Sequence, residues 1–305
     1  MDNKKVKGYA YGVIASVSYG LNPLFALPLY ASGIRVDSVL FYRYVFALLF
    51  LAVMMKMSGQ SFALKRNEIL PVAVMGLLFS FSSLFLFQSF NYMDAGIAST
   101  ILFMYPVLVA VIMAVFFKEK LSVVKIASIA TAFVGISMLY KGEGGATLSM
   151  TGVCLVLMSS LTYALYIVGV NRSSLKEMPG LKLTFYAILF GSLVYIVRLR
   201  GGMDLQWLTG GTQWMNALGL ALFPSLISMV TIAKAIRNIG ATPAAILGAL
   251  EPLTALFVGV MVFHERLTGG NVVGILLILF AVTLIVVGPH GWLRFKAVWH
   301  KRTVG

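Results

Sequence analysis

Long apolar runs separated by short polar gaps dominate the chain. Each run holds roughly 18–24 residues with almost no charge, about the length of helix that crosses the hydrocarbon core of a bilayer. The charged residues collect in gaps that are too short to form a folded soluble domain. We therefore predict an all-α membrane protein with ten transmembrane helices, at residues 8–31, 36–57, 69–90, 95–117, 123–140, 149–171, 181–200, 214–236, 242–263 and 270–289.

The first five apolar runs recur in the second half of the chain. Residues 8–42 match positions 144 further on, and from residue 82 the offset is 146. The matched pairs include Gly8 and Gly152, Ser16 and Ser160, Tyr19 and Tyr163, Tyr42 and Tyr186, Ser82 and Ser228, Pro106 and Pro252, and Glu119 and Glu265. Because five is odd, the second copy must enter the bilayer upside down. The repeat predicts two inverted five-helix halves around a central cavity, an architecture typical of alternating-access carriers.

The same pattern divides the chain into four parts. Residues 1–141 form the first repeat and 149–290 the second, and the Gly-rich stretch 142–148 links them. Residues 291–305 form a basic tail.

Composition agrees with a membrane protein, since 60% of the 305 residues are hydrophobic, 11% are charged and the mean hydropathy is +0.93. The net charge of +14 would suggest nucleic-acid binding in a soluble protein. Here, however, 18 basic residues fall on the side of the N-terminus and five on the other, so the charge is a topology signal. The five are Arg35, Lys141, Arg198, Arg200 and Arg266.

We expect both termini in the cytoplasm of a bacterial cell, the chain crossing the inner membrane many times, and no nucleic-acid partner. The expected partners are the lipid bilayer and a small-molecule substrate. Small residues at Gly8-xxx-Gly12 and Gly270-xxx-Gly274 let helices approach closely, within one subunit or between two, so monomer and homodimer both stay open. The single cysteine, Cys154, cannot form an intrachain disulfide, and we expect it in the helix core.

Two charges inside the predicted spans are the strongest candidates for substrate binding, because a charge in hydrocarbon costs about 2.5–3.5 kcal/mol on insertion scales. Glu251 lies near the middle of span nine, next to Pro252, and Arg43 lies in span two. A rise of about 1.5 Å per residue puts their depths roughly 6 Å apart. The guanidinium could hold a carboxylate, and Glu251 could accept an ammonium group or a coupling proton. The alternative is that Arg43 snorkels to the interface and Glu251 serves packing.

Further candidates are polar residues that could line the interface between the repeats, where such carriers bind substrate. Tyrosines at membrane interfaces and serines between helices have structural roles as well. These candidates are Tyr19, Asn22, Tyr42, Ser82, Gln88, Tyr105, Tyr163 and Ser228.

Glu119 and Glu265 sit at matching helix junctions and are expected to cap helices or to form gates, together with Pro106 and Pro252. No metal-binding motif and no cofactor-binding motif occurs, and we expect neither.

The second half of each copy contains a recognisable set of short motifs. It reads Ala95-Gly-Ile-Ala98, Tyr105-Pro106 and Phe117-Lys-Glu119-Lys-Leu121 in the first copy, and Ala241-Thr-Pro-Ala244, Glu251-Pro252 and Phe263-His-Glu265-Arg-Leu267 in the second. This ordered set resembles the EamA-type repeat of the drug/metabolite transporter superfamily, from Gly8 to about Gly288. The resemblance implies two antiparallel five-helix repeats with a central cavity and the export of small organic metabolites. The superfamily includes amino-acid exporters and carriers of sugars or nucleotide sugars, and the resemblance does not choose among these.

Other function classes are less well supported. The chain has no GxxxxGK[ST] phosphate loop, so it is not a P-loop pump. Its three histidines fall at span ends or in the tail, which argues against a buried Ser-His hydrolase, and we expect no enzyme. A channel would show a ring of equivalent charges, whereas Glu251 corresponds to Tyr105 in the other copy. The sequence therefore favours a secondary transporter that exports amino acids or related metabolites. The alternative is a carrier of other solutes, such as sugars, nucleotide-linked metabolites or drugs, and a channel is less favoured still.

Overall fold

The computed structural model describes residues 3–119, 122–140 and 149–303, and all regular elements within them are helices. The predicted linker 142–148 lies outside the described residues, and the structure describes no side chains beyond residue 286. The α-helices are α1 (Asn3–Gly20), α2 (Asn22–Ala31), α3 (Val36–Met57), α4 (Arg66–Ser89), α5 (Ala95–Leu102), α6 (Tyr105–Phe117), α7 (Val123–Tyr140), α8 (Met150–Arg172), α9 (Gly180–Arg198), α10 (Gly211–Leu220), α11 (Ser228–Ile239), α12 (Ala241–Leu247), α13 (Leu250–Phe263) and α14 (Gly269–Thr303).

Within these residues, nine helical segments are long and apolar enough to cross a membrane, and Val123–Leu139 is a shorter apolar helix. They fall at the ten predicted positions, with ends that differ by a few residues. The prediction of an all-helical, multi-pass membrane protein is therefore confirmed.

Four of the membrane-crossing segments are not continuous α-helices. The first is interrupted at Leu21, between α1 and α2. The fourth and ninth are each divided in two, as α5 and α6 and as α12 and α13, and the eighth contains a π-helix at Ala221–Ile227 between α10 and α11. A proline lies at or just after each interruption: Pro23, Pro106, Pro224 and Pro252. Because proline lacks an N–H and restricts the residue before it, it weakens the helix on its N-terminal side.

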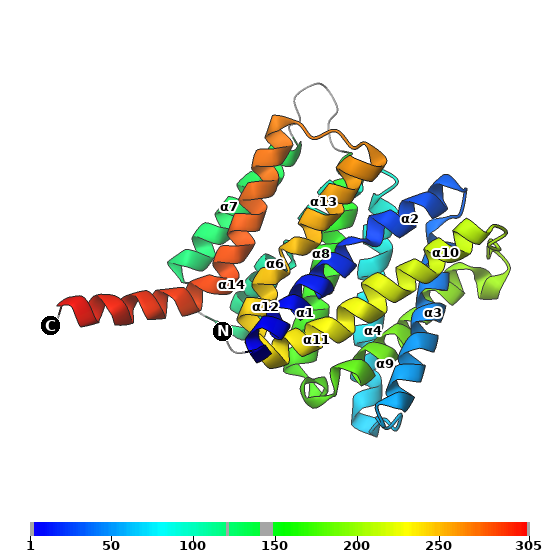
Figure 1. Ribbon diagram of the computed structural model, residues 1–305, viewed down its shortest axis with the longest axis horizontal. Helices are drawn as coiled ribbons and strands as arrows, with labels where there is room; N and C mark the ends of the chain where they lie inside the picture. Colours follow the sequence, from blue (N-terminus) through cyan, green and yellow to red (C-terminus); the bar gives the residue numbers. More distant parts are fainter. Residues whose placement is uncertain (1–2, 120–121, 141–148, 304–305) are drawn as a thin grey trace.

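The helices pack in long pairs (Figure 1): α14 runs along α7, α4 lies against both α8 and α9, and α1 lies along α11. Glycines make the closest of these contacts. Gly274 of α14 faces the backbone of Gly135 on α7, while Gly8 and Gly12 of α1 face Asn238 and Leu247. The small-residue motifs at Gly8 and Gly270 therefore serve contacts within the chain.

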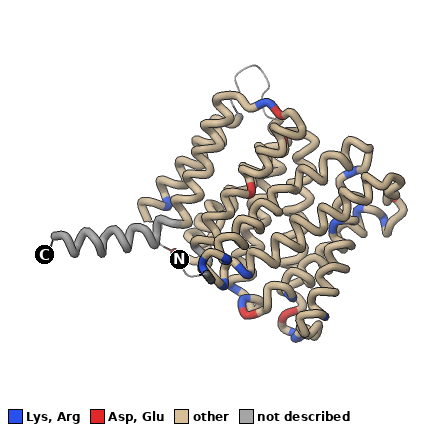
Figure 2. The backbone as a smooth tube through the Cα atoms, in the orientation of Figure 1, with Lys and Arg blue, Asp and Glu red and all other residues tan. Residues whose placement is uncertain are grey.

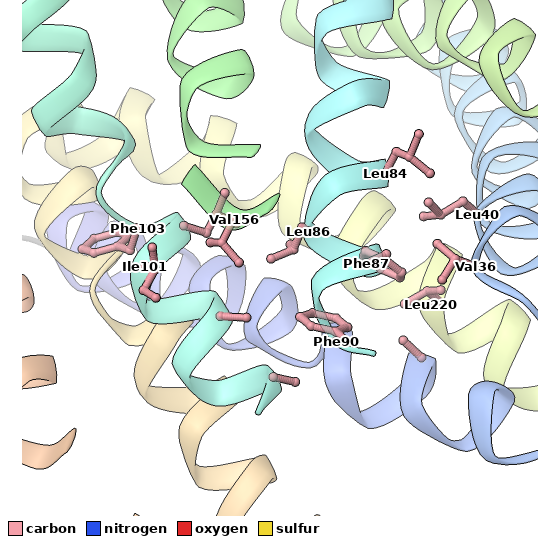
Figure 3. Close-up of a cluster of buried hydrophobic side chains, with 14 of the residues drawn as sticks. Val36, Leu40, Leu84, Leu86, Phe87, Phe90, Ile101, Phe103, Val156 and Leu220 are labelled. Atoms are coloured by element: carbon pink, nitrogen blue, oxygen red, sulfur yellow. The ribbon is translucent and has the colours of Figure 1, made fainter. Parts of the chain in front are cut away.

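Buried apolar side chains fill the space between the pairs. Figure 3 shows part of this core, where Leu40, Phe87 and Leu220 meet from α3, α4 and α10. Large apolar side chains also cover the outside of the bundle, such as Met57 and Phe116, which are 82% and 74% exposed. Such a surface suits lipid rather than water.

Cys154 corrects one expectation, because it is exposed on α8 rather than packed in the core. In a membrane protein the outer face of a helix is as apolar as the inner one, so a soluble-protein burial preference does not place a cysteine.

Charged residues gather at the ends of the helices (Figure 2). At one end, which we call the Glu119 end, Glu119 pairs with Arg172 at 2.9 Å and Lys182 bonds the Ala63 carbonyl. At the other, the Glu265 end, Arg198 holds Asp37 through two hydrogen bonds of 2.6 and 3.1 Å, which ties α9 to α3. The assignment of the Glu119 end to the cytoplasm rests on the basic residues and stays a prediction.

The close crossing of α4 and α9 yields a prediction. A Cβ added at Gly76 would lie 2.6 Å from the carbonyl oxygen of Ala187, so Gly76→Ala should force the helices apart. Overpacking of this kind costs about 1–3 kcal/mol, and the thermal midpoint of the purified protein in detergent should fall. Gly180→Ala is the control, because a Cβ there meets nothing within 4 Å. Equal midpoints for the two variants would contradict the tight crossing.

Candidate functional site

Three of the four helix interruptions converge on one small cavity inside the bundle, and the π-helix lies outside its lining. Residues of α1, α2, α4, α5, α6, α8 and α13 line it: Tyr19, Gly20, Asn22, Leu86, Ser99, Leu102, Phe103, Tyr105, Tyr163, Glu251 and Pro252. Its volume is about 20 Å³, room for about one water molecule. In this conformation the cavity is too small for an organic solute, so binding one requires the helices around it to move.

Two oxygen acceptors face this cavity. Glu251 stands in the first turn of α13, where the helix N-terminus favours a negative charge. Asn22 begins α2, and its Nδ2 donates to the Tyr19 carbonyl at 2.8 Å, which the interruption leaves available. The Asn22 Oδ1 is buried without a hydrogen-bond partner. A carboxylate and an unpartnered amide oxygen form an environment suited to a donor such as an ammonium group.

Arg43 lies behind the cavity rather than in its wall. It is 4% exposed, its Nε donates to Ser225 Oγ at 3.1 Å, and its guanidinium lies over the Phe87 ring at 5.2 Å. Tyr19, which does line the cavity, interacts electrostatically with both Arg43 and Glu251. Among the described residues Arg43 forms no ion pair. A buried guanidinium without a carboxylate partner is costly unless an anion reaches it.

Aromatic and aliphatic side chains make up the rest of the wall. Tyr105 and Tyr163 meet edge to face, with ring centroids 4.8 Å apart, and Tyr166 stacks on Tyr163 at 5.9 Å. Leu102 and Phe103 close the α5 side. These walls exclude water, which strengthens any charge interaction made inside.

A cleft of about 360 Å³ lies next to this cavity and extends to the Glu119 end. It shares Phe103 and Tyr105 with the cavity and contains Pro106 in its wall, and Glu119 and Lys125 line it as well. Its other walls come from α8, α12 and α14. Toward the Glu265 end, by contrast, α13 packs closely along α5.

Five of the predicted binding residues thus line the cavity, and the others lie elsewhere. Tyr42 donates to the Gln206 carbonyl at 3.1 Å. Ser82 bonds Ser159 between α4 and α8, and Ser228 is buried at the start of α11. Gln88 lines a separate pocket at the Glu265 end. The roles assigned to all of these residues remain predictions.

Glu265 caps the start of α5. Its Oε1 accepts a hydrogen bond from the Ala95 N–H at 2.9 Å and its Oε2 one from the Gly96 N–H at 3.3 Å. The carboxylate fits because Gly96 and Gly259 lack side chains: a Cβ at Gly259 would lie 2.1 Å from Oε2. Glu119, its sequence equivalent, makes no such contact in the described residues and pairs with Arg172 instead.

The groups around Glu265 shift the pKa of its carboxyl in opposite directions. Burial raises the pKa of the Glu265 carboxyl above its ordinary value, and the charge of Asp94 raises it further. The two backbone N–H groups lower the pKa of the same carboxyl, since they favour the charged form. Burial also raises the pKa of Asp94. The end of the bundle where α5 meets α13 therefore holds two partly desolvated carboxyl groups.

The sequence did not single out Ser160 as functional, yet it supports the cavity wall. Its Oγ lies 3.1 Å from the Ile101 carbonyl oxygen and 2.9 Å from that of Leu102, both at the end of α5. The Ile101 carbonyl also accepts a hydrogen bond from the Met104 N–H at 3.0 Å, so the hydroxyl from α8 chiefly serves the Leu102 carbonyl where α5 stops. The match of Ser16 with Ser160 in the repeat was the available signal. Leu86, Ser99 and Ser225 carried no signal, because single serines and leucines are common in any membrane helix.

Among the described residues no group of three or more His, Cys, Asp or Glu could hold a metal ion. The arrangement is an enclosed cavity with Glu251 in its wall and Arg43 outside it, next to a cleft at the Glu119 end.

Comparison with known proteins agrees with this architecture. The EamA-like transporter family matches the chain twice, over residues 6–141 and 150–287. The chain belongs to the EamA-like transporter family. The two matched stretches confirm the resemblance seen in the repeated motifs.

Individual relatives cover most of the chain. "Uncharacterized transporter YxxF" of Bacillus subtilis is 23% identical over 258 residues, 83% of this chain and 82% of the relative. "Uncharacterized transporter YcbK" of the same organism is 22% identical over 286 residues, 90% of this chain and 91% of the relative. "Uncharacterized transporter YvbV", also of B. subtilis, is 22% identical over 227 residues, 73% of each chain.

A solved crystal structure superposes on 92% of this chain and 96% of its own, with a TM-score of 0.63 and 15% sequence identity. That likeness concerns the fold alone. Together the comparisons support a multi-pass membrane transporter, and they leave the substrate to be argued from the cavity.

Ser160 provides a test of how the cavity wall is held. Ser160→Ala would remove the hydroxyl that the Leu102 carbonyl accepts, and an unpaired buried carbonyl costs about 1–3 kcal/mol, so the thermal midpoint should fall. Ser137→Ala is the control, since Ser137 is exposed and bonds a carbonyl of its own helix. A Ser160→Ala variant as stable as the control would show that Ser160 does not support α5.

Proposed function

We propose that this transporter exports amino acids or closely related zwitterionic metabolites across the bacterial inner membrane, by alternating access between two inverted five-helix halves. The observation that carries the proposal is a pair of opposite charges inside the bundle, the buried Arg43 and the half-buried Glu251. Both interact electrostatically with Tyr19, and they are not paired with each other in the described residues.

A zwitterion supplies the two charges that this chamber lacks. Its ammonium group would be held by Glu251 and the Asn22 Oδ1, which has no partner here. Once the helices around the cavity move apart, its carboxylate would accept hydrogen bonds from Arg43 and from the Tyr19 hydroxyl. Each interaction would be made in a chamber shielded by aromatic rings, where charge-assisted hydrogen bonds are strong.

A solute with only one charge fits less well. A neutral sugar would leave Arg43 and Glu251 without counter-charges, and an anionic nucleotide sugar would be repelled by Glu251. The apolar walls at Leu86, Leu102 and Phe103 would accept the side chain of an amino acid.

Alternating access is supported by the difference between the two ends. The cleft lies next to the chamber at the Glu119 end, while α5 and α13 pack together toward the Glu265 end. The basic residues favour the Glu119 end in the cytoplasm, so substrate would enter from the cytoplasm and leave on the other side. Interrupted helices at a central chamber are the usual construction of secondary transporters.

The first test measures transport by variants of the two charges. Glu251→Gln and Arg43→Ala should each slow transport of the cognate amino acid in proteoliposomes by roughly tenfold or more, because a hydrogen bond to a charged group contributes about 1.5–3 kcal/mol and about 1.4 kcal/mol is a factor of ten. A toxicity-rescue screen with a panel of amino acids and analogues in bacteria that express the protein would identify the substrate. Glu177→Gln is the control, since Glu177 is exposed in a short connecting helix. Wild-type rates in both charge variants would remove them from the binding site.

A second test separates the two ends of the zwitterion. The decarboxylated amine of the substrate should compete for transport much more weakly than the amino acid in the wild type. In Arg43→Ala this preference should disappear, because the group that recognises the carboxylate is gone. The deaminated acid should behave in the same way with Glu251→Gln. A preference for the amino acid that survives both substitutions would rule out zwitterion recognition by this pair.

A further inference from the structure

One face of α1 carries an unsatisfied hydroxyl. Gly12, Ser16 and Gly20 follow one another at four-residue spacing and so share a face of the helix. Gly12 lies against Leu247 at the end of α12, and Gly20 lies against the backbone oxygen of Glu251 at the start of α13. Ser16 stands between them and therefore faces the interruption between α12 and α13. Its side chain is fully buried, and its Oγ has no hydrogen-bond partner.

The equivalent serine of the other repeat has its partners. Ser160 bonds the carbonyls of Ile101 and Leu102 at the end of α5. The repeat offset places Leu247 and Gly248, at the end of α12, in correspondence with that pair. Here the Gly248 carbonyl accepts a hydrogen bond from the Glu251 N–H at 2.9 Å instead. Ser160 thus bonds the end of α5, whereas Ser16 makes no corresponding bond to the end of α12.

Two further contacts differ between the repeats in the same direction. Glu265 holds the start of α5, whereas Glu119 is turned to Arg172. Likewise α13 packs along α5, whereas the corresponding α6 and α12 make hardly any contact within the described residues. The α5 side of the molecule is therefore docked, and the α12 side, along the cleft, is not.

An unpaired buried hydroxyl is unfavourable, by about 1–3 kcal/mol. Alanine would fill nearly the same space without that cost. A serine at this position is explained if its hydroxyl forms a hydrogen bond in another conformation of the protein. The repeat itself shows what that use is, because Ser160 makes the corresponding bond.

We propose that Ser16 is a positioning residue for the opposite state of the transport cycle. When the Glu119 end closes, α12 moves against α1 and the carbonyls at its end accept the Ser16 hydroxyl, as those of α5 accept Ser160 here. Glu265 and Ser160 release α5 in the same step. This inference rests on the proposed alternating access.

Glu119 cannot fully replace Glu265 in that state. Met113 stands at the position equivalent to Gly259, whose missing side chain makes room for the Glu265 carboxylate. The opposite state therefore depends more on the contact between Ser16 and α12 than the present state depends on the contact between Ser160 and α5.

The test reads which side of the membrane reaches the chamber. In a Cys154→Ala background, Ser99→Cys places a reporter thiol in the cavity wall. The protein is reconstituted in liposomes in a known orientation, and a membrane-impermeant maleimide is applied from either side. The reagent reaches this thiol only when the helices around the cavity move apart, so the labelling rate from the Glu119 side reports opening toward the cleft and the rate from the Glu265 side reports the opposite state.

Ser16→Ala should lower the labelling rate from the Glu265 side by about five- to tenfold. It should leave labelling from the Glu119 side and the thermal midpoint unchanged or slightly raised, since no bond is lost in this state. Ser160→Ala is the matched variant, with the reverse result: faster labelling from the Glu265 side and a lower midpoint. A midpoint that falls in Ser16→Ala as in Ser160→Ala, or labelling from the Glu265 side that does not change, would overturn the role of Ser16.

The labelling needs no substrate, which separates this inference from the proposed function. If labelling shifts as expected but the protein transports no amino acid, the proposed substrate is wrong and the proposed role of Ser16 stands. Labelling of the parent protein from both sides with no response to Ser16→Ala would overturn the inference alone. Labelling from one side only, in every variant, would overturn both.

Discussion

Backbone hydrogen bonding in hydrocarbon is the constraint on which the site depends. A helix that crosses a bilayer must satisfy its own N–H and C=O groups, so each interruption has to find partners within the protein. The described structure meets this demand with side chains from neighbouring helices: Ser160 at the end of α5, Glu265 at its start and the Asn22 amide at the end of α1. The same groups that repair the interruptions also fix the walls of the cavity between them.

Polar groups placed by this repair explain why the chamber can hold opposite charges. The N-terminus of α13 favours a negative charge on Glu251. Arg43 donates a hydrogen bond to Ser225, which lies in the π-helix that contains Pro224. Two interrupted helices thus position the two charges independently. A ligand that connects them adds an electrostatic link between parts of the bundle that otherwise meet through Tyr19 and apolar packing.

Much of the architecture could be predicted from the sequence, because apolar length and repeated motifs are properties of the chain alone. The spans, the two copies and the family followed from these, and so did the place of Glu251 next to Pro252 at the start of the second part of span nine. The direction in which a side chain points was harder to predict. Arg43 stands behind Tyr19, Tyr42 bonds a loop carbonyl and Cys154 faces outward. Spacing along a helix sets depth, but when every face of the helix is apolar it does not show which one is buried. Repeat position placed Tyr19 and Tyr163 together in the cavity wall, but it did not do so for Tyr42, Ser82 or Ser228.

The smallness of the empty chamber has a consequence for the cell. A space with room for about one water molecule can hold neither a continuous file of waters nor an ion with its hydration shell. An idle copy of the protein is therefore an insulator. The membrane potential and the pH difference that the cell maintains would not leak away through it between cargoes, however many copies the membrane carries.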